Sequence, residues 1–416
     1  MRIFRLSFGL RALYVSAFTV LAGNAIQNIY IPMSAIHLGF SPFQVSLLGS
    51  FYFFGFVVGC LVVPQYLYSV GHIRTFAAFS ALAAVSAIVI SLSDSIVVWL
   101  PLRLLTGFSL AALYLSIESW ISAFSDDQSR GHVISIYRLV DITGALIGQG
   151  FLFAATGYED TLSVVAILLI LSLLPISLTQ IQMPVLVNAV PDRLREVLKK
   201  TYQLAPLSVW GTLLSGVVAG VFWSLIPLFV EGTGHESSAV PLVVSSYLIG
   251  GCVLQWPVGI WSDQIDRRKV IAVLCSISML AALLLTLGAH FGELGLLPLL
   301  LLVGFFGAGG IPIYSIAVAH ANDWVKSASV VDLSVLLLVS SSLGSVVGPL
   351  VAGAFMNSTS PKSFFVILLL SHGLLLLQAL CRIVRFPPIS PSKKGEYHDL
   401  PETTPMIATV AEGSES

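Results

Sequence analysis

The sequence is short of charged residues, which make up only 10% of its 416 positions. Soluble domains of ordinary composition carry about 25% charge. Hydrophobic residues account for 56% of the chain, and the mean hydropathy is +0.93. A chain this apolar has too little polar surface to cover a globule in water, so a lipid bilayer is its expected solvent. The net charge of -1 gives no reason to expect a nucleic acid as a partner.

Residues that could form a metal, disulfide or catalytic site are also scarce. His320 and Asp323 lie three residues apart without further ligands, so neither a metal nor another cofactor is expected. The sequence has no Walker loop and no convincing Ser/His/Asp or Cys/His set in its apolar segments, so an enzyme is not expected. The four cysteines have no CxxC spacing and are expected to be small apolar side chains. They are Cys60, Cys252, Cys275 and Cys381.

The abundant feature is the long apolar segment. A transmembrane helix needs roughly 20 predominantly apolar residues, and polar residues divide this chain into twelve such segments. The longest connection between them, 181–207, contains the segment Pro191–Glu196, which is expected to be a short amphipathic helix. The expected spans are 12–36, 42–68, 73–93, 96–121, 132–156, 161–180, 208–230, 240–262, 270–289, 295–319, 330–355 and 363–383.

The basic residues predict the orientation. With both termini placed in the cytoplasm, 17 of the 20 lysines and arginines fall on the cytoplasmic side, and only Lys362 falls on the opposite side. Arg103 and Arg138 lie inside spans. Such a bias is typical of a multi-pass protein that follows the positive-inside rule. The plasma membrane is the expected location.

The two halves of the chain share a spaced pattern. With a shift of 195 residues, Ile31-Pro32 falls on Ile226-Pro227, and the Ser-x-Tyr-x-x-Gly of 50–55 falls on that of 245–250. A shift of 197 aligns Gly107-Phe108 with Gly304-Phe305, and a shift of 200 aligns Gly144-x-x-x-Gly148 with Gly344-x-x-x-Gly348. The alternative is chance matching of common membrane residues, but four ordered matches favour a duplication.

These observations predict an all-α membrane protein with twelve transmembrane helices in two pseudo-symmetric six-helix bundles. The expected parts are an N-terminal bundle at 1–180, a cytoplasmic central loop at 181–207, a C-terminal bundle at 208–385 and a disordered cytoplasmic tail at 386–416. Transporters built from parallel repeats place their substrate near the midplane between the halves and alternate by rocking.

The loop after the eighth span resembles the signature cytoplasmic loop of the major facilitator superfamily, Gly-x-x-x-Asp-x-x-Gly-Arg-[Arg/Lys]. Here it runs from Gly259 to Lys269, and Asp266 replaces the second glycine. Its counterpart in the first half is degenerate and keeps Arg74. Arg103-x-x-x-Gly107 is similar to the family's arginine-containing fourth-helix motif, which is associated with proton coupling. The expected cytoplasmic gate comprises Gly259, Asp263, Arg267, Arg268 and Arg74.

The resemblance covers roughly residues 10 to 385 and looks closest to a poorly characterised bacterial branch. It implies a secondary transporter of a small solute in the bacterial inner membrane, driven by an ion gradient, with protons as the expected ion. The drug antiporters of the family carry Gly-x-x-x-Gly-Pro in the fifth span, whereas this span has Gly148 followed by Gln149. Drug antiport is therefore in doubt. The alternative function is a non-transporting membrane receptor or scaffold that keeps the fold.

Charged residues inside a membrane core predict functional sites. Asp141 could bind a proton while Arg138, three residues before it on the same helix face, tunes it; the alternative is a permanent salt bridge. Arg103 could couple protons or pack against helix ends and headgroups. Glu118 could carry a proton or act as a gate strut that pairs with Arg74 or Arg138.

Polar and aromatic side chains in the spans are candidates for a substrate cavity. The first span has three amides, which a lipid-facing helix would not carry; hydrogen bonding between helices is the alternative. Aromatic residues near helix ends could instead be interface anchors. The cavity candidates are Asn24, Gln27, Asn28, Tyr30, Gln149, Trp223, Tyr247, Gln255 and Trp256.

Overall fold

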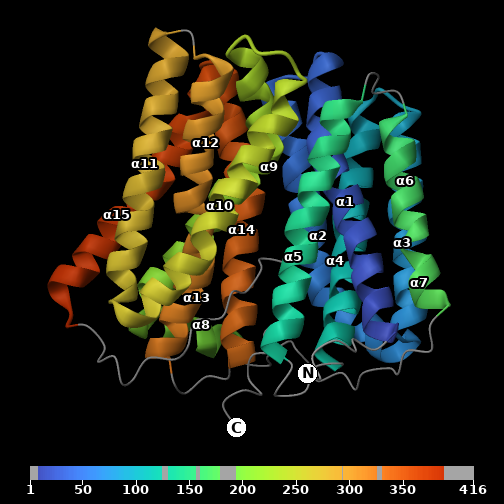
Figure 1. Ribbon diagram of the computed structural model, residues 1–416, viewed down its shortest axis with the longest axis horizontal. Helices are drawn as coiled ribbons and strands as arrows, with labels where there is room; N and C mark the ends of the chain where they lie inside the picture. The colour runs from blue at the N-terminus through green and yellow to red at the C-terminus, as the bar shows by residue number, and fades with distance from the viewer. Residues whose placement is uncertain are drawn as a thin grey trace, which may run out of the picture. The chain divides into compact units, whose positions relative to one another are not determined.

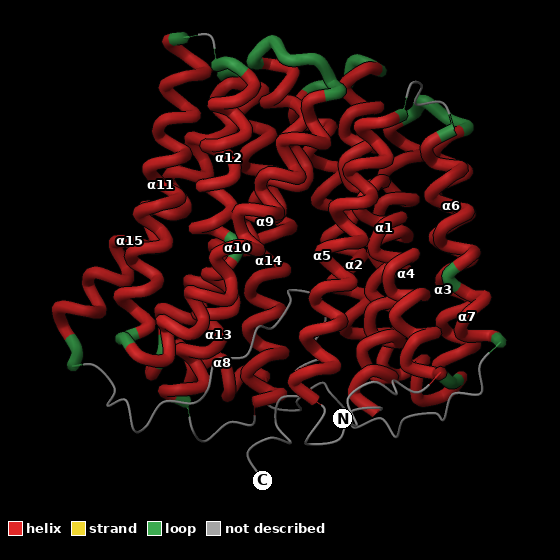
Figure 2. Tube along the Cα trace, viewed as in Figure 1, coloured by secondary structure: helices red, strands yellow, loops and turns green. Residues whose placement is uncertain are grey.

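The computed structural model describes residues 8–123, 130–155, 160–178, 194–292, 294–325 and 330–387. Within these ranges the chain consists of helices and short connections, without a strand (Figures 1 and 2). The expected disordered tail lies outside the described residues, apart from Phe386 and Pro387, and so does most of the central loop before Leu194.

The helices run in chain order and are labelled in Figure 1. They are α1 (Phe8–His37), α2 (Pro42–Val70), α3 (His72–Ser91), α4 (Ile96–Ala123), α5 (Arg130–Ala154), α6 (Thr161–Leu171), α7 (Leu173–Ser177), α8 (Leu194–Leu204), α9 (Pro206–Gly232), α10 (Ala239–Gln264), α11 (Arg267–Phe291), α12 (Leu296–Gly310), α13 (Pro312–Trp324), α14 (Val330–Ser358), the 3-10 helix η1 (Pro361–Ser363) and α15 (Phe364–Arg385).

Eleven segments of the described chain are long and apolar enough to cross a membrane, and a shorter apolar helix covers Thr161–Ser177. Together they correspond to the twelve spans expected from the sequence. Two spans are interrupted: the sixth at Ser172, between α6 and α7, and the tenth at Ile311, between α12 and α13. The second interruption has a local cause, because Pro312 lacks the N–H that would continue the helical ladder.

The helix ends agree with local sequence signals. Ser41 and Gln44 form a reciprocal capping box before α2: the Ser41 N–H donates to Gln44 Oε1 at 2.9 Å, and the Gln44 N–H donates to Ser41 Oγ at 3.3 Å. After α1 the backbone turns at Gly39, whose φ of 80° favours glycine. The expected amphipathic helix in the central connection is α8, which begins at Leu194 in the described chain.

Contacts divide the chain into two compact units. Among the described residues, unit 1 contains those of 8–31 and 51–178, and unit 2 contains those of 32–50 and 194–387. The segment Pro32–Ser50 therefore groups with the second half, although it joins α1 to α2. Within unit 2, Ser50 Oγ donates to the Val346 carbonyl at 2.8 Å, and a Cβ on Gly353 would collide with Ser46.

The internal repeat is visible in how glycines pack. In unit 1 a Cβ on Gly107 would collide with the Tyr52 carbonyl, and in unit 2 one on Gly307 would collide with the Tyr247 carbonyl. Gly107 is therefore equivalent to Gly307, and the shift of 197 that aligned it with Gly304 is wrong by one helical turn. Gly304 corresponds instead to Leu104, because these residues meet the equivalent Gly250 and Gly55.

The same repeat relates the packing of α1 on α5 to that of α9 on α14. Gly144 faces the Phe18 carbonyl, and Gly344 faces the Leu213 carbonyl. The shift is 200 residues for the glycines and 195 for their partners. The structure thus supports a duplication with a small insertion in the second half, between the second and fourth spans.

Candidate functional site

A buried arginine occupies the polar core of unit 1. Arg103, on α4, is only 3% exposed. One terminal nitrogen of its guanidinium donates to Asn28 Oδ1 at 3.2 Å, and its central carbon lies 4.5 Å from the centroid of the Tyr52 ring. The amide and the aromatic face partly replace the water that the cation loses on burial. Arg103 is therefore held in the core of unit 1 by α1 and α2.

Asn24 is the centre of the hydrogen bonds beside this arginine. Its Oδ1 accepts from the Tyr52 hydroxyl and from the side-chain amides of Gln27 and Asn28, each at 3.2 Å. Its Nδ2 donates to the Tyr114 hydroxyl at 2.8 Å. Three of the expected cavity residues thus form one network with the expected coupling residue Arg103. The bonds join α1 to α2 and α4, so helix-helix bonding, the alternative reading of the amides, accounts for part of their role.

Gln27 has unused hydrogen-bonding capacity. Its side chain is completely buried, and its Oε1 has no hydrogen-bond partner. Gln149 on α5 resembles it: Nε2 donates to the Ala25 carbonyl at 3.1 Å, while Oε1 is buried without a partner. A buried acceptor without a donor is costly unless water or a ligand supplies one. Tyr30, the remaining candidate on α1, is also buried.

Two carboxylates lie on the part of unit 1 formed by α4 and α5. Glu118 is completely buried and accepts a hydrogen bond from the Tyr137 hydroxyl at 3.1 Å. Asp141 pairs with Arg138 at 2.7 Å, as their spacing predicted, and both side chains are about a quarter exposed. Asp141 is therefore partly accessible while Glu118 is buried, and α5 carries both Arg138 and Asp141.

The corresponding region of unit 2 is aromatic. Phe222 stacks on Tyr247 with ring centroids 3.9 Å apart, and Tyr247 packs against Phe306. Of the expected cavity residues here, Tyr247 is buried in this stack, and half-buried Trp223 meets Phe222 edge-on. Gln255 is buried and donates to Ser315 Oγ at 3.3 Å.

Trp256 differs from these neighbours. It is 76% exposed on α10, although Gln255 beside it in sequence is buried. The exposed ring agrees better with an anchor at a membrane interface than with a residue packed in the core. Its place in a cavity stays a prediction.

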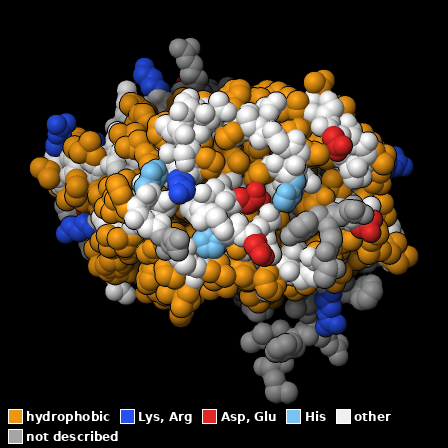
Figure 3. Space-filling model, turned by 90° about the horizontal axis from the view of Figure 1, so that it is seen from above, with side chains coloured by type: hydrophobic (Ala, Val, Ile, Leu, Met, Phe, Trp, Pro, Cys, Tyr) orange, Lys and Arg blue, Asp and Glu red, His pale blue; other side chains and the backbone are white. Residues whose placement is uncertain are grey.

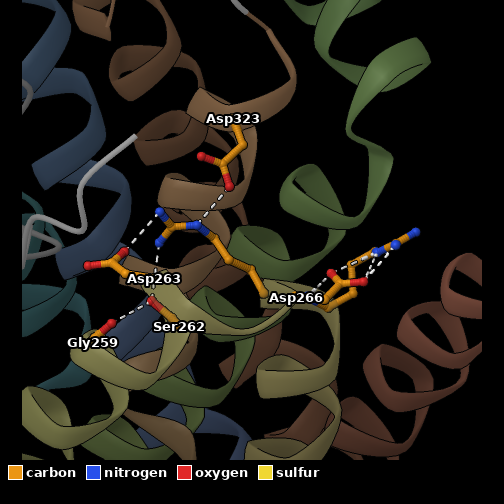
Figure 4. A network of polar contacts seen from close by, with 7 residues as sticks. Gly259, Ser262, Asp263, Asp266 and Asp323 are labelled. Carbon is orange, nitrogen blue, oxygen red and sulfur yellow. Dashed lines mark hydrogen bonds and ion pairs between the residues drawn. The ribbon is translucent and has the colours of Figure 1, made fainter. Parts of the chain in front are cut away.

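The signature loop forms an ion-pair network in unit 2 (Figure 4). Arg267 is 1% exposed, and its guanidinium contacts Asp323 at 2.8 Å and Asp263 at 3.1 Å. It also donates to Ser262 Oγ at 3.2 Å, and Ser262 donates to the Gly259 carbonyl at 2.8 Å. The network joins α10, α11 and α13. Asp323, considered above as a metal ligand with His320, is instead the carboxylate partner of Arg267.

Asp266, which departs from the family pattern, has its own structural role. It is the N-cap of α11: its Oδ1 accepts from the Arg268 backbone N–H at 3.1 Å, and its Oδ2 pairs with the Arg268 guanidinium at 2.6 Å. Burial raises the pKa of this carboxyl, but the hydrogen bonds from Arg268 outweigh burial and hold the pKa below its ordinary value.

Arg74 is the fifth expected gate residue. It is exposed on α3 and belongs to unit 1, whereas the other four belong to unit 2.

Three tyrosines of this region were not predicted from the sequence. Tyr52, Tyr114 and Tyr137 connect the network to Arg103 and Glu118, but none was among the expected site residues. Tyr114 precedes Glu118 by four residues and so shares its helix face, which is a signal that spacing could have supplied. Tyr52 was visible only as part of the repeated Ser-x-Tyr-x-x-Gly pattern.

Known proteins agree with this architecture. The sequence model of the Major Facilitator Superfamily matches residues 13–207 and 208–409, so the chain belongs to that family of membrane transport proteins. Two bacterial relatives bear the name "Uncharacterized MFS-type transporter". The protein of Yersinia pestis is 27% identical over 349 residues, and YcaD of Escherichia fergusonii is 25% identical over 345; each alignment covers 83% of this chain and 88% of the relative.

Solved structures share the fold at low sequence identity. The nucleoside transporter NupG superposes with a TM-score of 0.74 at 13% identity, over 91% of this chain and all of NupG. A bacterial homolog of the human lysosomal transporter Spinster gives 0.71 at 15% identity, over 91% of this chain and 98% of the homolog. The fucose:proton symporter FucP of E. coli gives 0.57 at 15% identity, over 90% of this chain and 98% of FucP.

Proposed function

We propose that this protein is a secondary active transporter that moves a small solute across the bacterial inner membrane by alternating access, coupled to protons. Membership of the superfamily and the names of its relatives support transport as the activity. The observation that carries the proposal is the polar core of unit 1. A buried guanidinium joined to amides and tyrosines is costly in a membrane, and function is the usual reason for such a cost.

The solute is proposed to bind at this polar core. Asn24, Asn28 and Gln27 offer amide donors and acceptors, and Tyr52 offers an aromatic face and a hydroxyl. The unpartnered Gln27 Oε1 would accept a hydrogen bond from a hydroxyl or amine of the solute. FucP is a symporter of fucose and protons and NupG is a nucleoside transporter, so two proteins with this fold carry polar, hydroxyl-bearing solutes.

Asp141 is proposed to bind the coupling proton. Its side chain is 24% exposed, so a proton can reach it more easily than it can reach buried Glu118, and it pairs with Arg138 at 2.7 Å. The two side chains share α5, so a rocking motion cannot pull their backbones apart. The switch must come from a change in water access or in side-chain conformation, which alters how strongly Arg138 competes with the proton. Glu118, buried with Tyr137, is the second candidate.

Residues 32–50 support the alternating-access part of the proposal. They lie at the expected outer ends of α1 and α2 and pack within unit 2 against α9 and α14. A Cβ on Gly49 would collide with Ser224, and Ser50 Oγ bonds to the Val346 carbonyl. Small residues and one hydroxyl contact can separate at low cost. In the proposed cycle, the contacts of residues 32–50 with α9 and α14 would form in one state and break in the other.

The proposed orientation places both termini in the cytoplasm. The charged residues described in the turns of the opposite side are acidic apart from Lys362: they are Asp94, Asp160, Glu231, Glu236 and Lys362. Seen from above, acidic and histidine side chains lie on this face, and hydrophobic side chains cover most of its edge (Figure 3). In a cysteine-free variant, cysteines at Glu236 and Lys362 should react with an impermeant reagent from outside intact cells. Reaction of one at Lys199 would overturn the orientation.

Flux through the purified protein tests the function. Proteoliposomes should accumulate a labelled solute under an imposed pH gradient, and a protonophore should abolish the accumulation. Candidate solutes can be chosen by a thermal-shift screen, because a ligand that binds the folded state raises apparent stability. A solute that binds but never crosses the bilayer would favour the receptor. Solute flux that does not depend on the pH gradient would contradict proton coupling but would still support transport as the activity.

A further inference from the structure

A basic corner lies at the expected cytoplasmic end of unit 2, outside the site described above. It is formed by the end of α8, the start of α11 and the end of α15. These helix ends carry half-buried Arg382 and four exposed cations, which are Lys199, Lys200, Lys269 and Arg385. The ion pairs of the signature loop do not neutralise this corner, because Asp266 is engaged by Arg268 and both Asp263 and Asp323 by Arg267.

Hydrogen bonds fix the three helices to one another at this corner. Arg382 donates to the Leu204 carbonyl at 3.1 Å, which ties the end of α8 to α15. Arg268 donates to the carbonyls of Arg382 and Phe386 at 2.9 and 3.1 Å, which ties α11 to α15. Lys200 is one helical turn before Leu204, and Lys269 follows Arg268. The cations are therefore carried by helix ends that these hydrogen bonds connect.

Helix α8 has the composition of a helix that lies at a membrane surface. Thr201 is buried against unit 2, whereas Leu198 and Tyr202, one turn apart, are 40% and 51% exposed. Lys199 is exposed beside them. An apolar stripe with a tyrosine, bordered by lysines, suits the boundary between acyl chains and headgroups. At the end of α15, Val384 and Phe386 are exposed next to Arg385 in the same way.

We propose that this corner binds an anionic phospholipid of the cytoplasmic leaflet. The phosphate would lie among Lys199, Lys200, Lys269 and Arg385, and the acyl chains would cover Leu198, Tyr202 and Val384. Clusters of basic residues on an amphipathic helix next to a transmembrane helix are typical of anionic lipid sites. Because α8 joins the two bundles, a bound lipid would also hold this connection to the membrane.

Native mass spectrometry of the purified full chain can measure the binding. Phosphatidylglycerol should bind more tightly than phosphatidylcholine. Each basic residue near an anionic surface strengthens binding about fivefold, so K199Q/K200Q should weaken phosphatidylglycerol binding by roughly 25-fold. The matched control is R11Q/K362Q, which removes exposed Arg11 and half-buried Lys362 at other places. It should change binding little.

Further measurements distinguish lipid binding from the binding of a free anion and from an effect of misfolding. L198S/Y202S keeps both lysines and should weaken lipid binding, while inorganic phosphate should not compete. Circular dichroism and gel filtration check that each variant is folded. Equal binding of the two lipids, equal weakening by K199Q/K200Q and by R11Q/K362Q, or full displacement of the lipid by inorganic phosphate would overturn the proposal.

Discussion

The two units are built on the same repeat, yet their equivalent positions carry opposite chemistry. Asn24, Gln27 and Arg103 in unit 1 correspond to Ala219, Phe222 and Val303 in unit 2. A polar network joins the three residues of unit 1, whereas those of unit 2 lie in the region where Phe222 stacks on Tyr247. The repeat therefore specifies where helices meet, and the side chains at those meetings have diverged.

At the expected cytoplasmic ends, unit 2 carries the charged contacts and unit 1 carries the aromatic ones. In unit 2, Arg267 is held by two carboxylates. Its counterpart in unit 1 is His72, which is buried against the Trp120 ring with centroids 5.2 Å apart. The buried arginine of unit 1 thus contacts an amide of α1, whereas the buried arginine of unit 2 contacts carboxylates of α10 and α13. We infer that the units divide the work, with solute and proton chemistry in unit 1 and gating in unit 2.

The strongest test of this division neutralises Asp141. D141N should abolish accumulation driven by a pH gradient but leave exchange of solute between the two sides, because no proton need move in exchange. Uptake and exchange in proteoliposomes measure the two activities. S341A changes the equivalent position of unit 2 and should preserve both. If D141N still concentrates solute with unchanged pH dependence, Asp141 is structural and Glu118 is the next residue to test.

Removing the buried arginine should have the next largest effect. R103M should lower the transport rate about 10- to 100-fold, since hydrogen bonds to charged groups contribute about 1.5–3 kcal/mol. The equivalent V303A should lower the thermal stability through a cavity costing about 1–3 kcal/mol, with little change in transport. Similar transport losses in both variants would show that the units do not differ in function.

The gate in unit 2 should respond more weakly. D263N should lower transport more than solute binding, by no more than about fivefold, because a partly exposed ion pair contributes only about 0–1 kcal/mol. Y68F, at the equivalent exposed position of unit 1, is the control. Transport rates and thermal shifts with solute measure the two effects. An equal loss of binding and transport, or no loss, would count against gating.

The smallest effect concerns how each unit starts its third helix. D266A removes an N-cap worth about 1 kcal/mol. G71A should cost about the same amount by a different route, because Gly71 has a φ of 90° that a Cβ disfavours.

The pH dependence of thermal stability distinguishes D266A from G71A. The pKa of folded Asp266 lies below the ordinary 3.8, so its contribution is present above that pH and is lost as pH falls through the folded pKa. Thermal unfolding in detergent between pH 3 and pH 7 should show a pH-dependent deficit for D266A and a constant one for G71A. If both variants lose the same stability at every pH, the charge of the Asp266 carboxylate does not contribute to the stability of the protein.

Periodicity and composition predicted the spans well because each span must satisfy its own backbone inside lipid. Pairs within one helix were also within reach of the sequence, as Arg138 and Asp141 show. Contacts between helices were not. Asn24 meets Tyr114 across 90 residues, and Arg267 meets Asp323 across 56. Such partners depend on helix rotation and packing, which hydropathy does not encode.

The register of the repeat shows the same limit. Matching letters paired Gly107 with Gly304, because both precede a phenylalanine. Packing pairs Gly107 with Gly307, since only that glycine meets the equivalent tyrosine carbonyl.

The sequence by itself determined that this protein spans a membrane, that it is duplicated, and that its basic residues favour one side. These properties follow from local hydropathy, spacing and charge, which act on each segment separately. Only the tertiary structure decided that Arg103 shares a network with Asn24 and Asn28, that Glu118 is buried beside Tyr137, and that Asp323 belongs to Arg267. Those outcomes require helices to meet at particular faces, and close packing at glycines brings those faces together.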